Sequence, residues 1–183
     1  ADAVRLVNRR GRYMQEAVPV GKGAMAAIVG MRPEEVESLC RDEAGDEVLA
    51  AANFNSPDQT VIAGSAEAVA RAVAAAPGRG AKRAIPLSVS APFHCGLMEP
   101  AQVRLAPDLN QASFSILAIP LIANVDARAL RGGGEARSSL IRQVTAPVRW
   151  EASVREMFRL GARTFVEVGP GKVLSGLVRR ILP

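Results

Sequence analysis

The sequence predicts an α/β protein in which a small β-α-β-β-α-β unit interrupts a larger α/β body. Residues 22–89 alternate short apolar runs with two amphipathic stretches, in the order of a split βαβ, or ferredoxin-like, unit. Residues 90–183 alternate strand-like and helix-like segments, which favours a parallel sheet. A helical pattern precedes the small unit, so residues 1–21 belong to the body, and residues 90–183 form the remainder of it.

The first element is a helix over residues 2–16, because apolar residues recur at helical spacing from Val4 to Met14. Arg10 does not fit the polar side of this helix. At 100° per residue it projects between Leu6 and Met14, inside the apolar arc. A buried guanidinium without acceptors is costly. Arg10 therefore binds an anion, forms an internal ion pair, or extends its charged end to water.

The small unit is read from its turn and helix-start signals. Pro33, followed by two glutamates, is a favourable first helical turn, and Ser65 is a suitable N-cap residue. The run Asn-Ser-Pro-Asp at 55–58 predicts a turn between two strands. The expected elements are strands at 25–29, 48–54, 60–63 and 84–89 and helices at 33–44 and 65–76.

The remainder of the body is expected to contain four helices and two strands. The glycine-rich run at 131–135 predicts a flexible surface loop. The expected elements are helices at 96–110, 138–143, 148–160 and 172–181 and strands at 120–125 and 164–168.

Composition limits the classes of function. The 183 residues are 49% apolar and 22% charged, enough to bury a core without disulfides, and two cysteines are too few for a disulfide framework. No signal peptide pattern and no apolar run of ~20 residues is present, so we expect a cytoplasmic protein that does not bind membranes. The net charge of +5 with only 4% aromatic residues favours an anionic small molecule or acidic partner over nucleic acid.

His94 is the only histidine and the one candidate general base. Alone it cannot form a multi-histidine metal site, and the cysteines and carboxylates show no metal-ligand spacing, so no metal is expected. The sequence also contains no G-x-S-x-G elbow and no dinucleotide or Walker fingerprint. By pattern alone, His94 is either a base or a structural histidine, and no reaction is named.

Several strings, in order along the chain, resemble one family. They are Arg10-Gly11 with Met14-Gln15; Gly23-Ala24-Met25-Ala26-Ala27-Ile28; Asn53-Phe54-Asn55-Ser56-Pro57; Pro92-Phe93-His94 with Leu97-Met98; Asn124-Val125-Asp126; Gln143 with Pro147-Val148-Arg149-Trp150; and Glu167-Val168-Gly169-Pro170-Gly171-Lys172-Val173-Leu174. Together they resemble the malonyl-CoA:acyl carrier protein transacylase family. The resemblance implies an α/β-hydrolase-like body with a ferredoxin-like insert. It also implies ping-pong transfer of malonyl from malonyl-CoA, a substrate rather than a cofactor, through an acyl-serine to the carrier protein's phosphopantetheine thiol.

The resemblance assigns the catalytic roles. His94 resembles the base that activates the serine and later the thiol. Gln143 resembles the acceptor that fixes the imidazole tautomer, with its main-chain carbonyl as the expected acceptor. Arg10 resembles the arginine that grips the malonyl carboxylate, which would leave an acetyl substrate with an unpaired guanidinium.

Three further residues have two readings each. Phe93, directly before the histidine, either disfavours a methylmalonyl unit by crowding its α-methyl group or only packs the pocket wall. Asn53 and Asn55 either hold the pantetheine or the carrier protein or only form the turn.

The chain departs from the family pattern because the nucleophilic serine and the G-Q-G-S-Q string are absent from it, as is a last C-terminal segment. It begins without Met inside a predicted helix and stops directly after another, so we expect both ends to be cut. We expect no transacylase activity from this polypeptide alone, and exposed apolar faces. The alternatives are the acyltransferase domain of a polyketide or multidomain fatty acid synthase and a ferredoxin-like nucleic-acid-binding module. The second is disfavoured because the small unit contributes only Phe54 as an aromatic residue.

Overall fold

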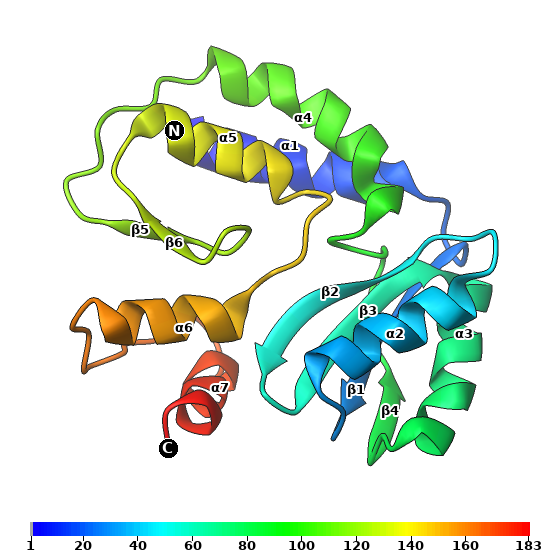
Figure 1. The fold of residues 1–183 in the computed structure, drawn as a ribbon. Coiled ribbons are helices and arrows are strands. Elements are labelled where there is room, and N and C mark those ends of the chain that lie inside the picture. The colour runs from blue at the N-terminus through cyan, green and yellow to red at the C-terminus, as the bar shows by residue number, and fades with distance from the viewer. Residues whose placement is uncertain (1) are drawn as a thin grey trace.

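The computed structural model describes residues 2–183 and shows an α/β arrangement of helices around two sheets (Figure 1). The larger sheet is antiparallel, in the strand order β2-β3-β1-β4. Two helices connect its strands, so the chain order is β-α-β-β-α-β. These elements are β1 (Gly23–Val29), α2 (Pro33–Ala44), β2 (Leu49–Ser56), β3 (Gln59–Ser65), α3 (Ala66–Ala75) and β4 (Arg83–Pro86).

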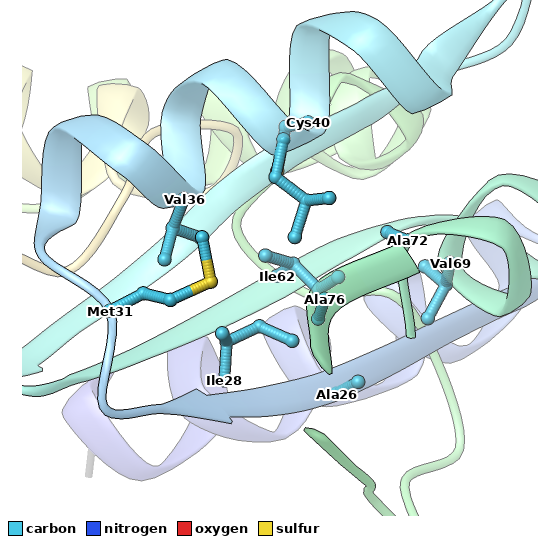
Figure 2. Packing of buried hydrophobic residues seen from close by; sticks show 10 residues of the cluster. Ala26, Ile28, Met31, Val36, Cys40, Ile62, Val69, Ala72 and Ala76 are labelled. Carbon is cyan, nitrogen blue, oxygen red and sulfur yellow. The ribbon is translucent and has the colours of Figure 1, made fainter. Parts of the chain in front are cut away.

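One face of this sheet packs against α2 and α3. Residues at alternate positions on a strand point to the same face, so Ala26 and Ile28 of β1 lie beside Ile62 of β3. Val36 of α2 and Val69 of α3 close over them (Figure 2). Many of the core residues are alanine, which lets the helices lie close to the strands.

The other face of the sheet is covered by the segment that follows β4. Met25 and Ala27, which alternate with the residues facing the helices, contact a second cluster that contains Cys95. Phe93 packs against this cluster as well. The segment around position 94 is thus packed against the larger sheet.

The remaining helices form two groups beside the larger sheet (Figure 1). Helix α1 packs against α4, and α4 against α5, while α6 and α7 pack together beside β2. Their bounds are α1 (Asp2–Ala17), α4 (Glu99–Gln111), α5 (Gly133–Arg142), α6 (Trp150–Arg159) and α7 (Val173–Ile181), with short 3-10 turns η1 (Ala76–Arg79) and η2 (Gly96–Met98). A small antiparallel hairpin consists of β5 (Leu121–Ala123) and β6 (Arg128–Leu130).

Polar contacts fix α1 on α4. The Tyr13 hydroxyl donates to Asp108 at 3.1 Å, and Arg9 forms an ion pair with the same carboxylate. The Arg104 guanidinium lies 4.2 Å from the centre of the Tyr13 ring and also pairs with Glu16. The orientation of α1, and with it the direction of Arg10, is therefore set by both apolar and polar contacts.

Two expectations for the second half of the chain were wrong at the level of single elements. The expected loop at 131–135 is confined to residues 131 and 132, because α5 begins at Gly133 and the Glu135 carboxylate accepts a bond from the Gly132 amide at 3.3 Å. Residues 164–168 are not a strand. A strand needs a neighbour for its backbone groups, and no segment among residues 2–183 pairs with these; Glu167 instead accepts bonds from the first turn of α7.

The sheets within residues 2–183 are antiparallel. The expected strand at 120–125 forms only the short hairpin partner β5. The parallel contact that the described residues do contain is a single bridge between Asn53 and Val148. Over the same residues, no helix combines the length and the hydropathy that crossing a bilayer requires.

Candidate active site

His94 lies in the turn between β4 and η2. Its backbone φ of +61° is in the left-handed region, which a residue with a Cβ seldom adopts. The flanking residues hold it there, since Cys95 is buried and its Sγ donates to the Pro92 carbonyl at 3.1 Å, while Phe93 packs into two clusters at once. Strain kept in place by tight packing is typical of a functional residue.

The His94 imidazole is bound through its Nδ1 atom. This nitrogen lies 2.9 Å from the main-chain oxygen of Gln143. A carbonyl oxygen only accepts, so Nδ1 carries the proton and the Nε2 lone pair is available to take another. The Gln143 main-chain oxygen, which the family resemblance implied as the acceptor, is thus the hydrogen-bond partner of the ring.

The surroundings keep the imidazole neutral. Burial lowers the pKa of His94 below its usual 6.5, and the positive charge of Arg10 lowers it further, whereas the carbonyls of Gln143 and Ala146 act in the opposite direction. A neutral imidazole with a free Nε2 is the form that a general base needs.

Arg10 is half-buried on α1 and forms no hydrogen bond or ion pair within residues 2–183. Burial lowers its pKa. Arg10 and Gln143 line one cavity of about 400 Å³ whose other walls are mostly apolar, among them Leu6, Leu105, Leu109, Phe114 and Leu140. A guanidinium without a partner in an apolar cavity is suited to a carboxylate, which it can bind with two parallel hydrogen bonds.

The structure thus bonds His94 to Gln143 and places Gln143 in one cavity with Arg10, a cavity that His94 itself does not line. The other two predicted residues lie elsewhere. Phe93 packs into the two apolar clusters and does not line the Arg10 cavity. Asn55 lies at an irregularity of the β2–β3 ladder, beside the turn at the far end of β2. No hydrogen bond within residues 2–183 joins Asn55 to Arg10 or His94.

The expected helices at 138–143 and 148–160 leave a turn between them, but the pairing of this turn with β2 was not predicted. The Phe54 amide donates to the Val148 carbonyl at 2.9 Å, and the Val148 amide donates to the Ala52 carbonyl at 2.8 Å. The edge of the larger sheet is therefore bonded to the segment that carries the histidine's acceptor. The available signal was Pro147, which cannot continue a helix after Gln143. Over residues 2–183 no cluster of three histidine, cysteine or carboxylate side chains could hold a metal ion.

A family model for the acyl transferase domain matches residues 1–182. The chain belongs to this acyl transferase family. It is 50% identical over 182 residues to the malonyl CoA-acyl carrier protein transacylase of Escherichia coli K12, covering 100% of the chain and 59% of that protein. It is 44% identical to the enzyme of the same name from Bacillus subtilis, covering 98% and 57%. The chain therefore spans a little under three fifths of the length of these relatives.

Solved structures of the acyl transferase family have the same fold over this chain. The malonyl CoA-acyl carrier protein transacylase of Coxiella burnetii superposes with a TM-score of 0.96 at 46% identity, over 99% of this chain and 57% of that one. A malonyl-transacylase in complex with a type II PKS acyl-carrier protein gives a TM-score of 0.96 at 45% identity, over 98% and 58%. The α/β class predicted from the sequence is confirmed by these matches.

Proposed function

We propose that the full-length protein, by which we mean one of the relatives' length that carries this chain, transfers malonyl from malonyl-CoA to the phosphopantetheine thiol of acyl carrier protein for fatty acid synthesis. The observation that carries this proposal is the position of Gln143, which shares an apolar cavity with the unpaired Arg10 guanidinium and binds the His94 imidazole through its main-chain oxygen. The relatives from E. coli K12 and B. subtilis bear the name of this activity.

In the first half-reaction His94 acts as the general base. A serine outside residues 1–183 attacks the thioester carbonyl of malonyl-CoA, and its hydroxyl proton passes to Nε2 of His94. The C–S bond breaks, the proton on Nε2 protonates the leaving thiolate, and malonyl remains on the serine as an ester. The Gln143 carbonyl stabilises the imidazolium because it already accepts the Nδ1 proton.

The second half-reaction uses the same groups in the same order. The carrier protein's thiol gives its proton to Nε2 of His94 and attacks the serine ester. The C–O bond breaks, and Nε2 returns the proton to the serine oxygen. Malonyl-CoA is a substrate, and the proposed chemistry uses no cofactor and no metal.

Arg10 selects the acyl group. Its guanidinium pairs with the free carboxylate of malonyl, whereas an acetyl group offers it nothing. Phe93, beside the base, is proposed to limit branching at the α-carbon, and Asn55 to contact the pantetheine arm or the carrier protein at the far end of β2. The half-burial of Phe93 and the irregular ladder at Asn55 support these roles.

We further propose a cytoplasmic protein with an α/β-hydrolase-like body, residues 1–21 and 90–183, and a ferredoxin-like insert, residues 22–89. The strand order β2-β3-β1-β4 is that of a ferredoxin-like sheet. In the body, Val166 and Val168 are 79% and 92% exposed, which suits a segment that the rest of the full-length protein covers.

A polyketide carrier protein is the second acceptor that an observation favours. One solved relative of this chain is a malonyl-transacylase bound to a type II PKS acyl-carrier protein. The chemistry of transfer is the same, and only the carrier protein differs.

The test uses the full-length protein with malonyl-CoA. We expect intact-mass analysis to show a malonyl ester on one serine, and addition of carrier protein to move it to the pantetheine thiol. His94→Gln should abolish ester formation. As a control for folding, the His94→Gln protein and the parent protein should give the same circular dichroism spectrum. Absence of any malonyl ester on the parent protein would reject the proposal.

A further inference from the structure

The main-chain carbonyl of Gln143 is released from its helix by a proline. In an α-helix each carbonyl accepts from the amide four residues later. Four residues after Gln143 stands Pro147, which has no amide proton. The carbonyl is therefore one of the groups that a helix end leaves without an internal partner, and the Nδ1 proton of His94 takes that place.

The side chain of Gln143 closes the same turn. A carboxamide nitrogen carries two protons, and here Nε2 of Gln143 donates to the carbonyls of Ala146 at 2.9 Å and Pro147 at 3.2 Å. The Ala146 carbonyl, like that of Gln143, raises the pKa of the His94 ring. A single residue thus binds the imidazole with its backbone and holds a second carbonyl near it with its side chain.

Both ends of the turn are anchored. At its start, the Gln143 amide donates to the Ser139 carbonyl at 2.9 Å, at the end of α5. At its other end, Val148 exchanges backbone hydrogen bonds with β2. Between these anchors, the Gln143 carboxamide forms the side-chain hydrogen bonds that connect Ala146 and Pro147 to Gln143.

We propose that the Gln143 carboxamide is a positioning group for the base: it holds the 143–147 turn so that the Gln143 carbonyl stays on Nδ1 of His94 and keeps Nε2 unprotonated. The carboxamide nitrogen donates to two main-chain carbonyls of the turn and acts on the base through them, so Gln143 is a positioning residue. Its effect on turnover rests on the proposed function, whereas its effect on the imidazole tautomer does not.

The decisive measurement is the ¹⁵N NMR spectrum of the imidazole in the full-length protein, with the His94 signals assigned by their loss in a His94→Gln variant. The parent protein should show one tautomer, protonated on Nδ1. In Gln143→Met, which keeps the side-chain length but removes both donated bonds, we expect a mixture of both tautomers. In the same variant kcat should fall roughly tenfold, equal to ~1.4 kcal/mol in the barrier, with KM for malonyl-CoA changed less than about twofold.

Gln102→Met is the matched control. The Gln102 carboxamide donates to the Ile141 carbonyl at 3.0 Å and accepts from the Thr145 hydroxyl at 3.4 Å. This variant therefore loses contacts with the end of α5 and with Thr145 of the turn, but keeps both bonds that the Gln143 carboxamide donates. It should leave the His94 tautomer and kcat unchanged. Tautomer mixing of equal size in both variants would mean that any loosening of α5 has this effect, and it would overturn the proposal.

Pro147→Ala tests the same turn independently, and serves if Gln143→Met does not fold. It supplies an amide four residues after Gln143 that competes for the carbonyl, so tautomer mixing is expected here too. A folded Gln143→Met or Pro147→Ala protein that keeps the single Nδ1-protonated form overturns the proposal. A parent protein that shows this tautomer but forms no malonyl ester rejects the proposed function and leaves the positioning role to be decided by the spectra.

Discussion

His94 and Gln143 are separated by 49 residues, yet the imidazole Nδ1 of the first lies 2.9 Å from the main-chain oxygen of the second. This bond decides which ring nitrogen is protonated. It also joins the segment after β4, which packs on the larger sheet, to the end of α5. The base is therefore positioned from both parts of the molecule.

The pH dependence of ester formation should follow His94. Its neutral form is the active one, and burial together with the charge of Arg10 lowers its pKa below 6.5. The rate with malonyl-CoA in the full-length protein should therefore fall as the pH is lowered, with the midpoint of this acid limb below 6.5. Arg10→Ala removes a positive charge, so the midpoint of the acid limb should move to higher pH; an unchanged or lower midpoint would contradict the electrostatic coupling.

Arg10→Ala should alter the choice of acyl group. Loss of the charge-assisted pair should lower kcat/KM for malonyl-CoA by roughly 10- to 100-fold, or ~1.4–2.8 kcal/mol, and change that for acetyl-CoA by less than about threefold. Arg5→Ala, an exposed arginine on the same helix, is the control and should change neither. Equal losses with both substrates after Arg10→Ala would show that the guanidinium does not bind the carboxylate.

Replacement by alanine at two glycines should change the free energy of unfolding in opposite directions. At Gly64 a Cβ would lie 2.0 Å from the Val48 carbonyl oxygen and 2.8 Å from Leu49 Cα, so Gly64→Ala should force β2 and β3 apart and lower the free energy of unfolding by about 1–3 kcal/mol. At Gly11, inside α1, a Cβ meets nothing within 4 Å, and Gly11→Ala should raise the free energy of unfolding by about 0.5–1 kcal/mol. Urea unfolding of the two variants decides this, and changes of the same sign would refute the packing argument.

The two cysteines should be unreactive in the folded chain. Burial raises the pKa of Cys40 to about 12 and also raises that of Cys95, so neither forms a thiolate near neutral pH. A reagent that labels thiols by disulfide exchange should therefore label neither cysteine at pH 8 until denaturant is added, when both cysteines should react. Rapid labelling of either residue without denaturant would show that its cover opens.

Local signals in the sequence fixed the elements of the larger sheet. Helix α2 begins at Pro33 and ends at Ala44 as expected, because proline and two glutamates favour the start of a helix. The turn signal at 55–58 falls between β2 and β3. In contrast, Thr164–Val168 has the composition of a strand, but strand formation depends on a neighbour, and nothing within five residues reveals whether one is present.

The sequence by itself determined that Arg10 falls on the apolar side of its helix and that one histidine is available as a base. It also carried the family resemblance, which the comparisons confirm. Only the tertiary structure decided that the guanidinium lies without a partner among residues 2–183 and that a proline frees the carbonyl which binds the ring. The physical reason is that helical periodicity is set by neighbours a few residues away, whereas burial, charge coupling and the pairing of Nδ1 depend on segments brought together by packing.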